Sequence, residues 1–279
     1  DPTGRTAPPR GEQIRLSPSQ LESVLTCPRQ YFLSREVTAD PPRGSTTILG
    51  SVIHAVAERA ATGELTPATA SELLDEVWET IPFPAAWLSA SERAEADAAV
   101  ERFVAWQSAH DHADVVGVEV PFRAEVEVDG EVVVLAGNVD RLERTPTGDL
   151  RVVDFKTGRS LPTVADAAAS PQVGVYQLAI EHGGFDEHAP GAHSAGASLV
   201  YLRHDGSPGW PKDFRQPSLA EKPHLSDDPD ENAYPTWVHH QVAKARRVLA
   251  SWSFDAQPGG HCQWCPVRSS CPAKSGQVV

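Results

Sequence analysis

The sequence VVDFKTG at residues 152–158, preceded by GNVD at residues 137–140, decides the fold of this chain. In each stretch an aspartate follows apolar residues, and in the second Lys156 lies two residues after Asp154. Because successive side chains of a β-strand alternate between its faces, we expect Asp154 and Lys156 to share one face while Phe155 points into the core. The pattern predicts a strand that carries an acid and a base on one face.

The flanking sequence predicts buried strands at 132–135 and 150–155, joined through a turn at 147–149. Asp140 and Asp154 then stand at the ends of apolar runs. Two carboxylates that converge beside an ammonium group call for a divalent cation, and a lysine there can orient a water molecule and stabilise charge on a phosphate. The pattern favours metal-assisted phosphodiester hydrolysis, and an ordinary charged surface hairpin is the alternative.

Composition argues against a uniformly basic surface. The 279 residues include 24 Lys and Arg against 38 Asp and Glu, which gives a net charge of −14. Binding to a phosphate backbone follows local rather than total charge, so we expect a modest basic strip or a basic partner. Lys244, Arg246 and Arg247 on the last predicted helix are the best candidates for such a strip, and a solvated helix face is the alternative.

The ends and the hydropathy of the chain predict a soluble, cytoplasmic protein without a membrane partner. No apolar run approaches the roughly 20 residues that span a bilayer, and the polar, Pro-rich start does not resemble a signal peptide. The chain contains no methionine. We therefore expect an excised or processed fragment of a longer protein.

The four cysteines form the second strong signal. Cys262, Cys265 and Cys271 follow a C-x2-C-x5-C pattern near the end of the chain, and Cys27 stands alone near its start. Four thiolates favour an iron–sulfur cluster or zinc, with disulfides as the alternative and His261 as a possible substitute ligand. With Cys27 as the fourth ligand, the metal would join the two ends of the chain as a structural staple.

The remaining pattern predicts helices before and after a set of strands. Asp129-Gly130 is a hairpin signal, and Gln172 and Tyr176, four residues apart, share a helix face. The order indicates an α/β core with an N-terminal helical elaboration. Helices are expected at 17–35, 49–62, 67–80, 89–110, 171–182 and 235–253, strands at 122–128, 131–135, 150–155 and 197–203, and a largely irregular excursion at 204–234.

Six segments, in order and over nearly the whole chain, resemble the RecB-type nucleases of the PD-(D/E)xK superfamily, specifically the subgroup that carries an iron–sulfur cluster. The split of the cysteines, one before the nuclease core and three after it, is similar to that of AddB-type and Adn-type helicase–nuclease subunits. The family's literal Pro-Asp pair is replaced by Val139-Asp140. The segments are Leu16–Glu22 leading to Cys27-Pro28, Gly50-x-x-x-His54, Gly137-x-Val139-Asp140-Arg141, Val153–Gly158, Gln172-x-x-x-Tyr176 and the terminal cysteine triplet.

The resemblance implies a role for each matching residue. It assigns the catalytic lysine to Lys156, places Gln172 and Tyr176 beside the active site, and favours a [4Fe–4S] cluster over zinc. Glu119 resembles a recurrent family acid and is kept as a second-tier candidate, because a surface acid is equally plausible. The implied ligands of Mg²⁺ or Mn²⁺ are His54, Asp140, Asp154 and the backbone carbonyl of Phe155, and those of the cluster are Cys27, Cys262, Cys265 and Cys271.

The resemblance also implies a fold, a domain layout and a function. The fold would be a restriction-endonuclease-like α/β core, with a mixed central sheet flanked by helices, an N-terminal helical elaboration and a C-terminal iron–sulfur loop. Residues 1–15 would be disordered or a linker, and 16–279 a single nuclease domain. The function would be cleavage of single-stranded DNA, or of duplex ends, as the nuclease module of a helicase–nuclease in double-strand break repair. The alternatives are a free-standing RecB-like or CRISPR-adaptation-type exonuclease and a non-catalytic DNA-binding scaffold.

Overall fold

The computed structural model describes residues 13–37, 50, 56, 67–79, 81, 83, 85–110 and 114–275. Contacts divide the chain into two compact units. Unit 1 comprises residues 1–42, 123–137 and 222–279, and unit 2 comprises residues 43–122 and 138–221. Most of the helix predicted at 49–62 lies outside the described residues.

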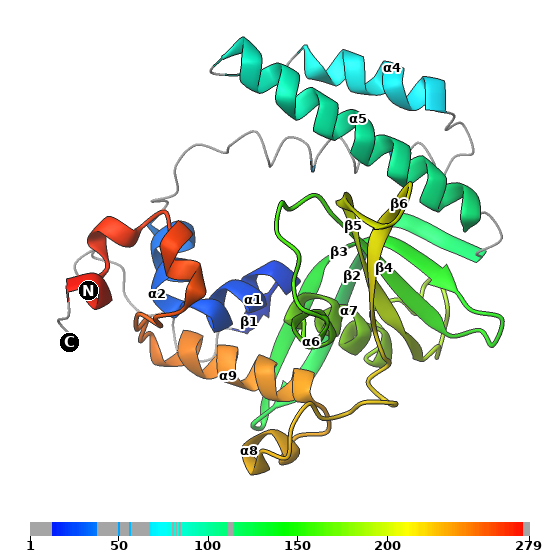
Figure 1. Cartoon of the computed structure of the whole chain (residues 1–279). Helices are drawn as coiled ribbons and strands as arrows, with labels where there is room; N and C mark the ends of the chain where they lie inside the picture. Colours follow the sequence, from blue (N-terminus) through cyan, green and yellow to red (C-terminus); the bar gives the residue numbers. More distant parts are fainter. Residues whose placement is uncertain are drawn as a thin grey trace. The chain divides into compact units, whose positions relative to one another are not determined.

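A mixed sheet is the central element of the fold (Figure 1). Its strand order is β1-β3-β4-β5-β6, and β2 also pairs with β3. The β1–β3 and β4–β5 pairs are parallel, whereas the β3–β4 and β5–β6 pairs are antiparallel. The predicted mixed α/β sheet flanked by helices is confirmed. The strands are β1 (Ile14–Leu16), β2 (Asp114–Val128), β3 (Glu131–Arg144), β4 (Leu150–Lys156), β5 (Ser194–Ser207) and β6 (Trp210–Gln216).

The hairpin between β2 and β3 turns where Asp129-Gly130 predicts it. Both residues have positive φ angles, 54° and 73°, as a two-residue primed turn requires. The strands on either side are longer than predicted. Asp140 therefore lies inside β3 and not at the end of a strand, because the strand continues through Gly137 and Asn138 to Arg144.

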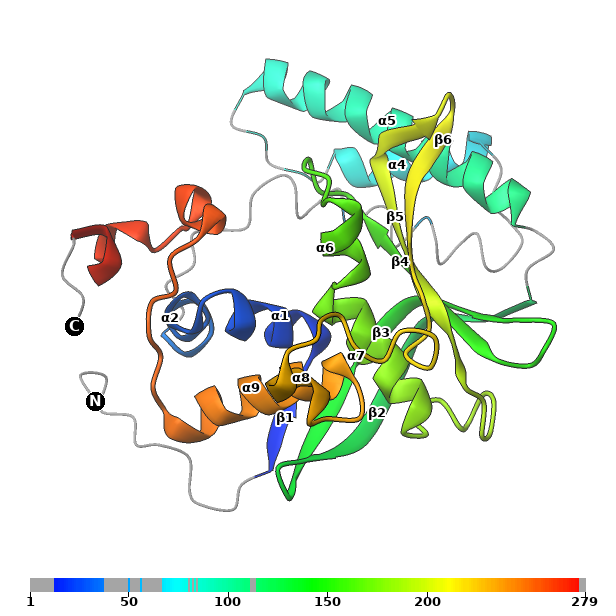
Figure 2. The ribbon, with the colours of Figure 1, turned by 60° about the horizontal axis from the view of Figure 1, so that its bottom comes forward.

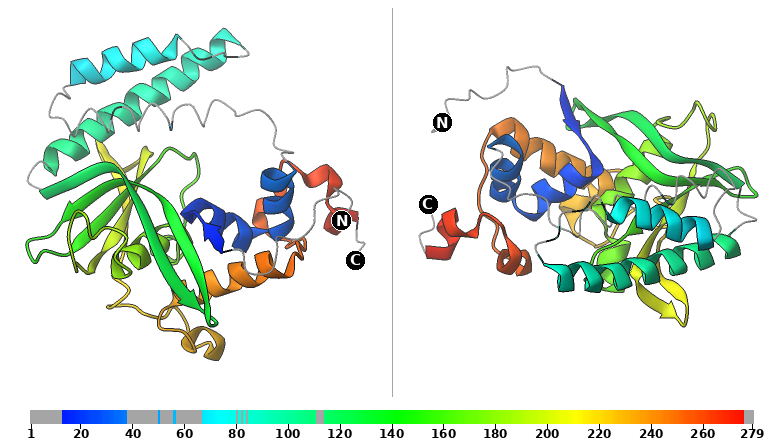
Figure 3. Two further views of the ribbon diagram at one scale, coloured as in Figure 1. Left: turned by 180° about the vertical axis from the view of Figure 1, so that it is seen from behind. Right: turned by 90° about the horizontal axis from the view of Figure 1, so that it is seen from above.

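Two layers of helices cover the sheet of unit 2. The first layer contains α4 (Pro67–Trp78) and α5 (Ala86–Ala109), which run side by side in Figures 1 and 3 and are joined by an Arg93–Asp75 ion pair of 2.6 Å. The second layer contains α6 (Val164–Ala168) and α7 (Pro171–Glu181), which Figure 2 shows clearly. The helices predicted at 67–80, 89–110 and 171–182 are thus confirmed.

The side chains of β4 point alternately toward the two helix layers. The Phe155 ring packs edge-on against the rings of Phe103 and Trp106 of α5, with centroids 5.1 and 5.2 Å apart. On the opposite face Asp154 contacts α7. The alternation predicted for Asp154 and Phe155 is therefore confirmed, and it places the polar residues of β4 under α7.

Unit 1 contains short helical elements near its first and last residues and one long helix, α9 (Trp237–Ser251). A single helix over 17–35 is wrong, because the backbone at Cys27 is extended (φ −161°, ψ 104°). Pro28 lacks an N–H and disfavours the helical conformation at the residue before it. The short elements are α1 (Pro18–Thr26), α2 (Pro28–Tyr31), the π-helical turn η1 (Phe32–Glu36), α8 (Pro229–Asn232) and the 3₁₀ turns η2 (Gly260–Trp264), η3 (Arg268–Ser270) and η4 (Pro272–Ser275).

The excursion predicted at 204–234 is more regular than expected. Strand β5 continues to Ser207 and β6 returns from Trp210, with Gly209 at φ 79° in the turn between them. The Pro and Gly residues that indicated a loop instead form a tight hairpin turn, since glycine adopts positive φ without steric cost. Residues 229–232 also form α8.

The candidate basic strip on α9 is partly neutralised. Arg247 is paired with Asp129 at 3.0 Å and also contacts the Tyr234 hydroxyl. The ion pair and the Tyr234 hydrogen bond to Asp129 hold the pKa of the Asp129 carboxyl below its usual value. Lys244 is exposed. No helix in the described ranges has the length and apolarity to cross a membrane.

Candidate active site

Two buried aspartates lie side by side on β3 and β4. Arg141 of β3 pairs with Val153 of β4, so Asp140 and Asp154 occupy the next position along the two antiparallel strands. The Phe155 N–H donates a hydrogen bond of 2.7 Å to Asp140 Oδ2. The exposed fractions of Asp140 and Asp154 are only 8% and 2%. The structure thus brings together the two acids that the sequence singled out.

The electrostatics of this pair suit a bound cation. Burial raises the pKa of the Asp140 carboxyl well above its usual value, and the charge of Asp154 raises it further, against the opposing effects of the Phe155 N–H and the Lys156 ammonium. Two buried carboxylates this close together are not both ionised unless a positive charge neutralises them. Carboxylate oxygens are the preferred ligands of Mg²⁺, so the donor set fits a divalent cation.

Gln172 connects the polar groups of the site. Its Oε1 accepts a hydrogen bond of 2.5 Å from Lys156 Nζ, and its Nε2 donates to Asp154 Oδ1 at 3.0 Å. The same amide nitrogen lies 3.3 Å from the hydroxyl oxygen of Tyr176. Lys156 Nζ also forms an ion pair of 2.8 Å with Asp154 Oδ2. One glutamine therefore orients an acid, a base and a hydroxyl.

Tyr176 reaches the site from one turn further along α7, as the four-residue spacing predicts. Its hydroxyl donates to Asp154 Oδ1 at 3.5 Å, and its ring packs edge-on against Phe122 with centroids 5.8 Å apart. Burial and the charge of Asp154 both raise the pKa of Tyr176, which keeps the hydroxyl protonated. Tyr176 is thus a neutral hydrogen-bond donor.

Glu119 on β2 faces Asp140 closely enough for its charge to raise the pKa of Asp140. Its backbone has a φ of 50°, in the left-handed region that non-glycine residues seldom adopt. Such conformations cost of order 1–3 kcal/mol and cluster at functional sites. The unusual backbone keeps Glu119 as a candidate that the strand pattern alone did not favour.

The histidine among the predicted metal ligands, His54, lies outside the described residues. Two residues of the same segment are described. Gly50 lies close to Thr157, the residue that follows Lys156, since a Cβ at Gly50 would be 3.4 Å from Thr157 Oγ1. Val56 is fully buried in the core cluster that contains Phe155. Within the described residues, no group of three or more His, Cys, Asp or Glu side chains is arranged to hold a metal ion.

Sequence reasoning missed two supporting contacts. The first is the Phe155 N–H, which fixes the Asp140 carboxylate and has no signature in the side-chain pattern. The second is Arg141, whose buried guanidinium pairs with Glu143 at 2.7 Å and lies over the Trp106 ring. In the sequence, only its place directly after Asp140 pointed to a role for Arg141 near the site. Arg141 points to the face opposite Asp140 and anchors β3.

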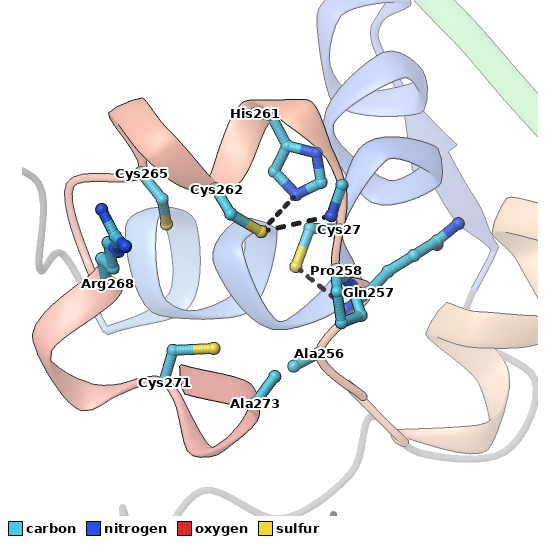
Figure 4. Close-up of a pocket in the computed structure, with 11 residues that line it drawn as sticks. Cys27, Ala256, Gln257, Pro258, His261, Cys262, Cys265, Arg268, Cys271 and Ala273 are labelled. Carbon is cyan, nitrogen blue, oxygen red and sulfur yellow. Dashed lines mark hydrogen bonds between the residues drawn. The ribbon is translucent and has the colours of Figure 1, made fainter. Parts of the chain in front are cut away.

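The four cysteines line one cavity of about 250 Å³ in unit 1 (Figure 4). All four are free thiols, and Cys27 is buried. Backbone N–H groups donate to two of the sulfurs, from Gln257 to Cys27 at 3.5 Å and from Gly259 to Cys262 at 3.3 Å. Hydrogen bonds of this kind accompany thiolate clusters and tune them. The four thiols therefore share one cavity without disulfide pairing, but among the described residues they are not gathered closely enough to form a metal site as they stand.

Comparison with known proteins shows the family of this chain. No curated protein matches the chain. A solved structure named SSO0001 is 15% identical to it, with a TM-score of 0.45, and the match covers 94% of this chain and 88% of the other. Residues 15–272 match the PD-(D/E)XK nuclease superfamily, which implies a metal-dependent nuclease and DNA as a substrate. This chain belongs to the PD-(D/E)XK nuclease superfamily.

Proposed function

We propose that this chain is a Mg²⁺- or Mn²⁺-dependent deoxyribonuclease whose catalytic residues are Asp140, Asp154, Lys156, Gln172 and Tyr176. The observation that carries the proposal is the set of hydrogen bonds that Gln172 makes to Asp154, Lys156 and Tyr176. A structural ion pair would not need a second acid, a bridging amide and a neutral hydroxyl at the same place. Catalytic groups need such mutual orientation to act together.

The metal ligands would be Asp140, Asp154 and the backbone carbonyl of Phe155, with His54 as the fourth. The raised pKa of Asp140, which results from burial and from the charge of Asp154, supports this assignment. Glu119 is a further, weaker candidate for an acidic residue of the site. When bound, the cation would supply Lewis acidity at the scissile phosphate and lower the pKa of a water molecule.

Lys156 would position the attacking water and stabilise negative charge on the phosphate. Its side chain is 27% exposed, so substrate can reach an ammonium group that Asp154 and Gln172 already orient. Tyr176 would hold the Asp154 carboxylate through its neutral hydroxyl. Gln172 and Tyr176 would thus act by aligning the lysine and the acid, or by contacting the DNA backbone.

We further propose that Cys27, Cys262, Cys265 and Cys271 bind a [4Fe–4S] cluster. Four thiols that line one cavity support a thiolate-bound metal, and the resemblance to the iron–sulfur subgroup of RecB-type nucleases favours the cluster over zinc. The cluster would staple the start of unit 1 to its end. If the cysteines bound zinc instead, metal analysis would find zinc and the protein would be colourless.

The biological setting that we propose is an Adn-type or AddB-type helicase–nuclease, in which a motor delivers single-stranded DNA to this nuclease module for break resection. A free-standing RecB-like or CRISPR-adaptation-type exonuclease keeps the same chemistry and differs in needing no motor. A non-catalytic scaffold would have no use for the aligned Asp154, Lys156 and Gln172 side chains, which is the observation against it.

The first test is cleavage of 5′-labelled single-stranded DNA with Mn²⁺, beside an EDTA control and the variant Asp154→Ala. We expect metal-dependent cleavage that falls at least about a thousandfold in the variant, as for removal of a group central to the charge in the transition state. Asp227→Ala, which removes an exposed carboxylate outside the site, is the matched control and should cleave normally. Intact DNA from folded wild-type protein, or cleavage by Asp154→Ala, would contradict the proposal.

A further inference from the structure

A buried carboxylate holds an exposed arginine beside the candidate active site. Glu92 of α5 is only 4% exposed, and its two oxygens bind two arginines. Glu92 Oε2 accepts from Arg203 of β5 at 2.8 Å, and Oε1 accepts from Arg159 in the loop after β4. The side chains of Arg203 and Arg159 are 2% and 58% exposed. The same acid therefore anchors one buried and one accessible guanidinium.

The position of this cluster follows from the sheet. Strands β4 and β5 are parallel, with Lys156 beside Tyr201, so Arg159 in the loop after β4 and Arg203 further along β5 both lie beyond Lys156 in the same direction. Arg159 is three residues beyond Lys156, which limits the separation of their Cα atoms to about 11 Å. A nucleic-acid strand at Lys156 spans that distance in a few nucleotides, at a rise of about 3.4 Å each.

The loop that carries Arg159 is held in place at more than one point. The Gly158 carbonyl lies 3.3 Å from His204 Nε2 of β5, and Arg159 is bound to Glu92. A held guanidinium loses less side-chain entropy on binding than a free one. The anchoring thus prepares Arg159 for a ligand and leaves most of its five N–H donors toward solvent.

Charge balance does not require Arg159. Arg203 already supplies one positive charge to the one negative charge of Glu92, at hydrogen-bond distance and almost fully buried. Arg159 adds a second positive charge, so the three side chains carry a net +1 in a protein of net charge −14. A local positive charge next to the catalytic lysine attracts phosphate, whatever the total charge of the chain.

We propose that Arg159 binds a backbone phosphate of the nucleic-acid strand within a few nucleotides of the one that is cleaved, and that Glu92, backed by Arg203, is the residue that positions it. This inference rests on the proposed nuclease function and adds a substrate contact to it. Arginine is suited to the role, because its planar donors match phosphate oxygens in a bidentate geometry.

The test measures binding of fluorescein-labelled oligo-dT in EDTA, by anisotropy over a range of salt concentrations, so that no cleavage step is needed. Arg159→Ala should weaken binding about tenfold and reduce the dependence of log K on log salt by about 0.7, the value for one phosphate contact on a single strand. Arg159→Lys should keep the salt slope and recover only part of the affinity. Arg215→Ala, an exposed arginine of β6, is the matched control and should change neither quantity.

Glu92→Gln tests the positioning role. It should weaken binding severalfold with the salt slope kept, and this loss should disappear in the Arg159→Ala background, because a positioning residue acts only through its partner. A purely structural role of the cluster would instead lower the melting temperature of Arg159→Ala and leave the salt slope unchanged.

The outcomes separate this inference from the proposed function. Unchanged affinity and slope in Arg159→Ala, with wild-type cleavage that needs Mn²⁺ and Asp154, would overturn the role of Arg159 alone. A wild-type protein that binds oligo-dT through Arg159 but does not cleave it would overturn the nuclease and keep the contact. Wild-type protein that does not bind oligo-dT would overturn the Arg159 contact directly.

Discussion

The candidate nuclease site of unit 2 and the cysteine cavity of unit 1 are built in different ways. In the nuclease site, side chains from β3, β4 and α7 hydrogen-bond directly to one another. Around the cavity, Cys27 comes from a break between helices, Cys262 from the 3₁₀ turn η2, and the other two cysteines from the residues that directly follow η2 and η3. All four are free thiols. Regular elements hold a site in place by their own hydrogen bonds and packing, whereas short turns bury little. We therefore expect the first site to be preorganised and the second to depend on its cofactor.

The largest expected effect is on the cysteine side of this comparison. Cys27→Ala should remove the brown chromophore and about 2–5 kcal/mol of stability, a fall in melting temperature of roughly 5–20 °C, because the link between distant segments is lost. Visible absorption, iron analysis and thermal melting measure this. Ser269→Ala, at an exposed position of the same turns, is the control. A colourless variant with wild-type stability and activity would show that the cavity needs no cofactor.

An intermediate effect is expected at the preorganised site. Gln172→Ala should lower the rate of cleavage about 10- to 100-fold, since Lys156 and Asp154 lose the amide that aligns them. The iron content and melting temperature should stay close to those of the wild type. Single-turnover cleavage with Mn²⁺ separates this loss from weaker DNA binding. Wild-type rates in Gln172→Ala would show that the strands alone align the site.

The smallest effect concerns the stability of the metal-free protein. The pKa of Asp140 is raised by burial and by the charge of Asp154. At a pH between the ordinary carboxyl pKa and this raised value, the folded chain therefore holds a proton that the unfolded chain has released. Stability therefore falls as the pH rises from the ordinary carboxyl pKa through the raised value. Asp140→Asn removes this cost and should raise the melting temperature at pH 7 by roughly 2–4 °C, which corresponds to about 1 kcal/mol.

The same variant should lose cleavage and any stabilisation by Mn²⁺, which wild-type protein should show in a thermal melt. Below the ordinary carboxyl pKa the two proteins should melt alike, because Asp140 is then protonated in both states. Asp227→Asn, outside the site, should match the wild type at every pH. A lower melting temperature for Asp140→Asn at pH 7 would mean that Asp140 is held by favourable contacts and does not await a cation.

Local pattern was sufficient for most of the fold. Alternation in β4 predicted the opposite directions of Asp154 and Phe155, and Asp129-Gly130 predicted the hairpin, because both depend on neighbouring residues alone. The helix break at Cys27 and the β5–β6 hairpin were missed. The break follows from the local effect of Pro28 on the residue before it, whereas the hairpin depends on the pairing of β5 with β6.

The sequence by itself singled out the candidate site residues, since Asp140, Asp154, Lys156, Gln172 and the cysteines stand in spaced motifs along the chain. Only the tertiary structure decided how they act on one another. The Phe155 N–H that binds Asp140, the glutamine that joins three groups of the site, and the buried Glu92 that holds Arg159 all join residues from different elements. Such contacts depend on strand register and helix packing, which the order of residues within one element does not specify.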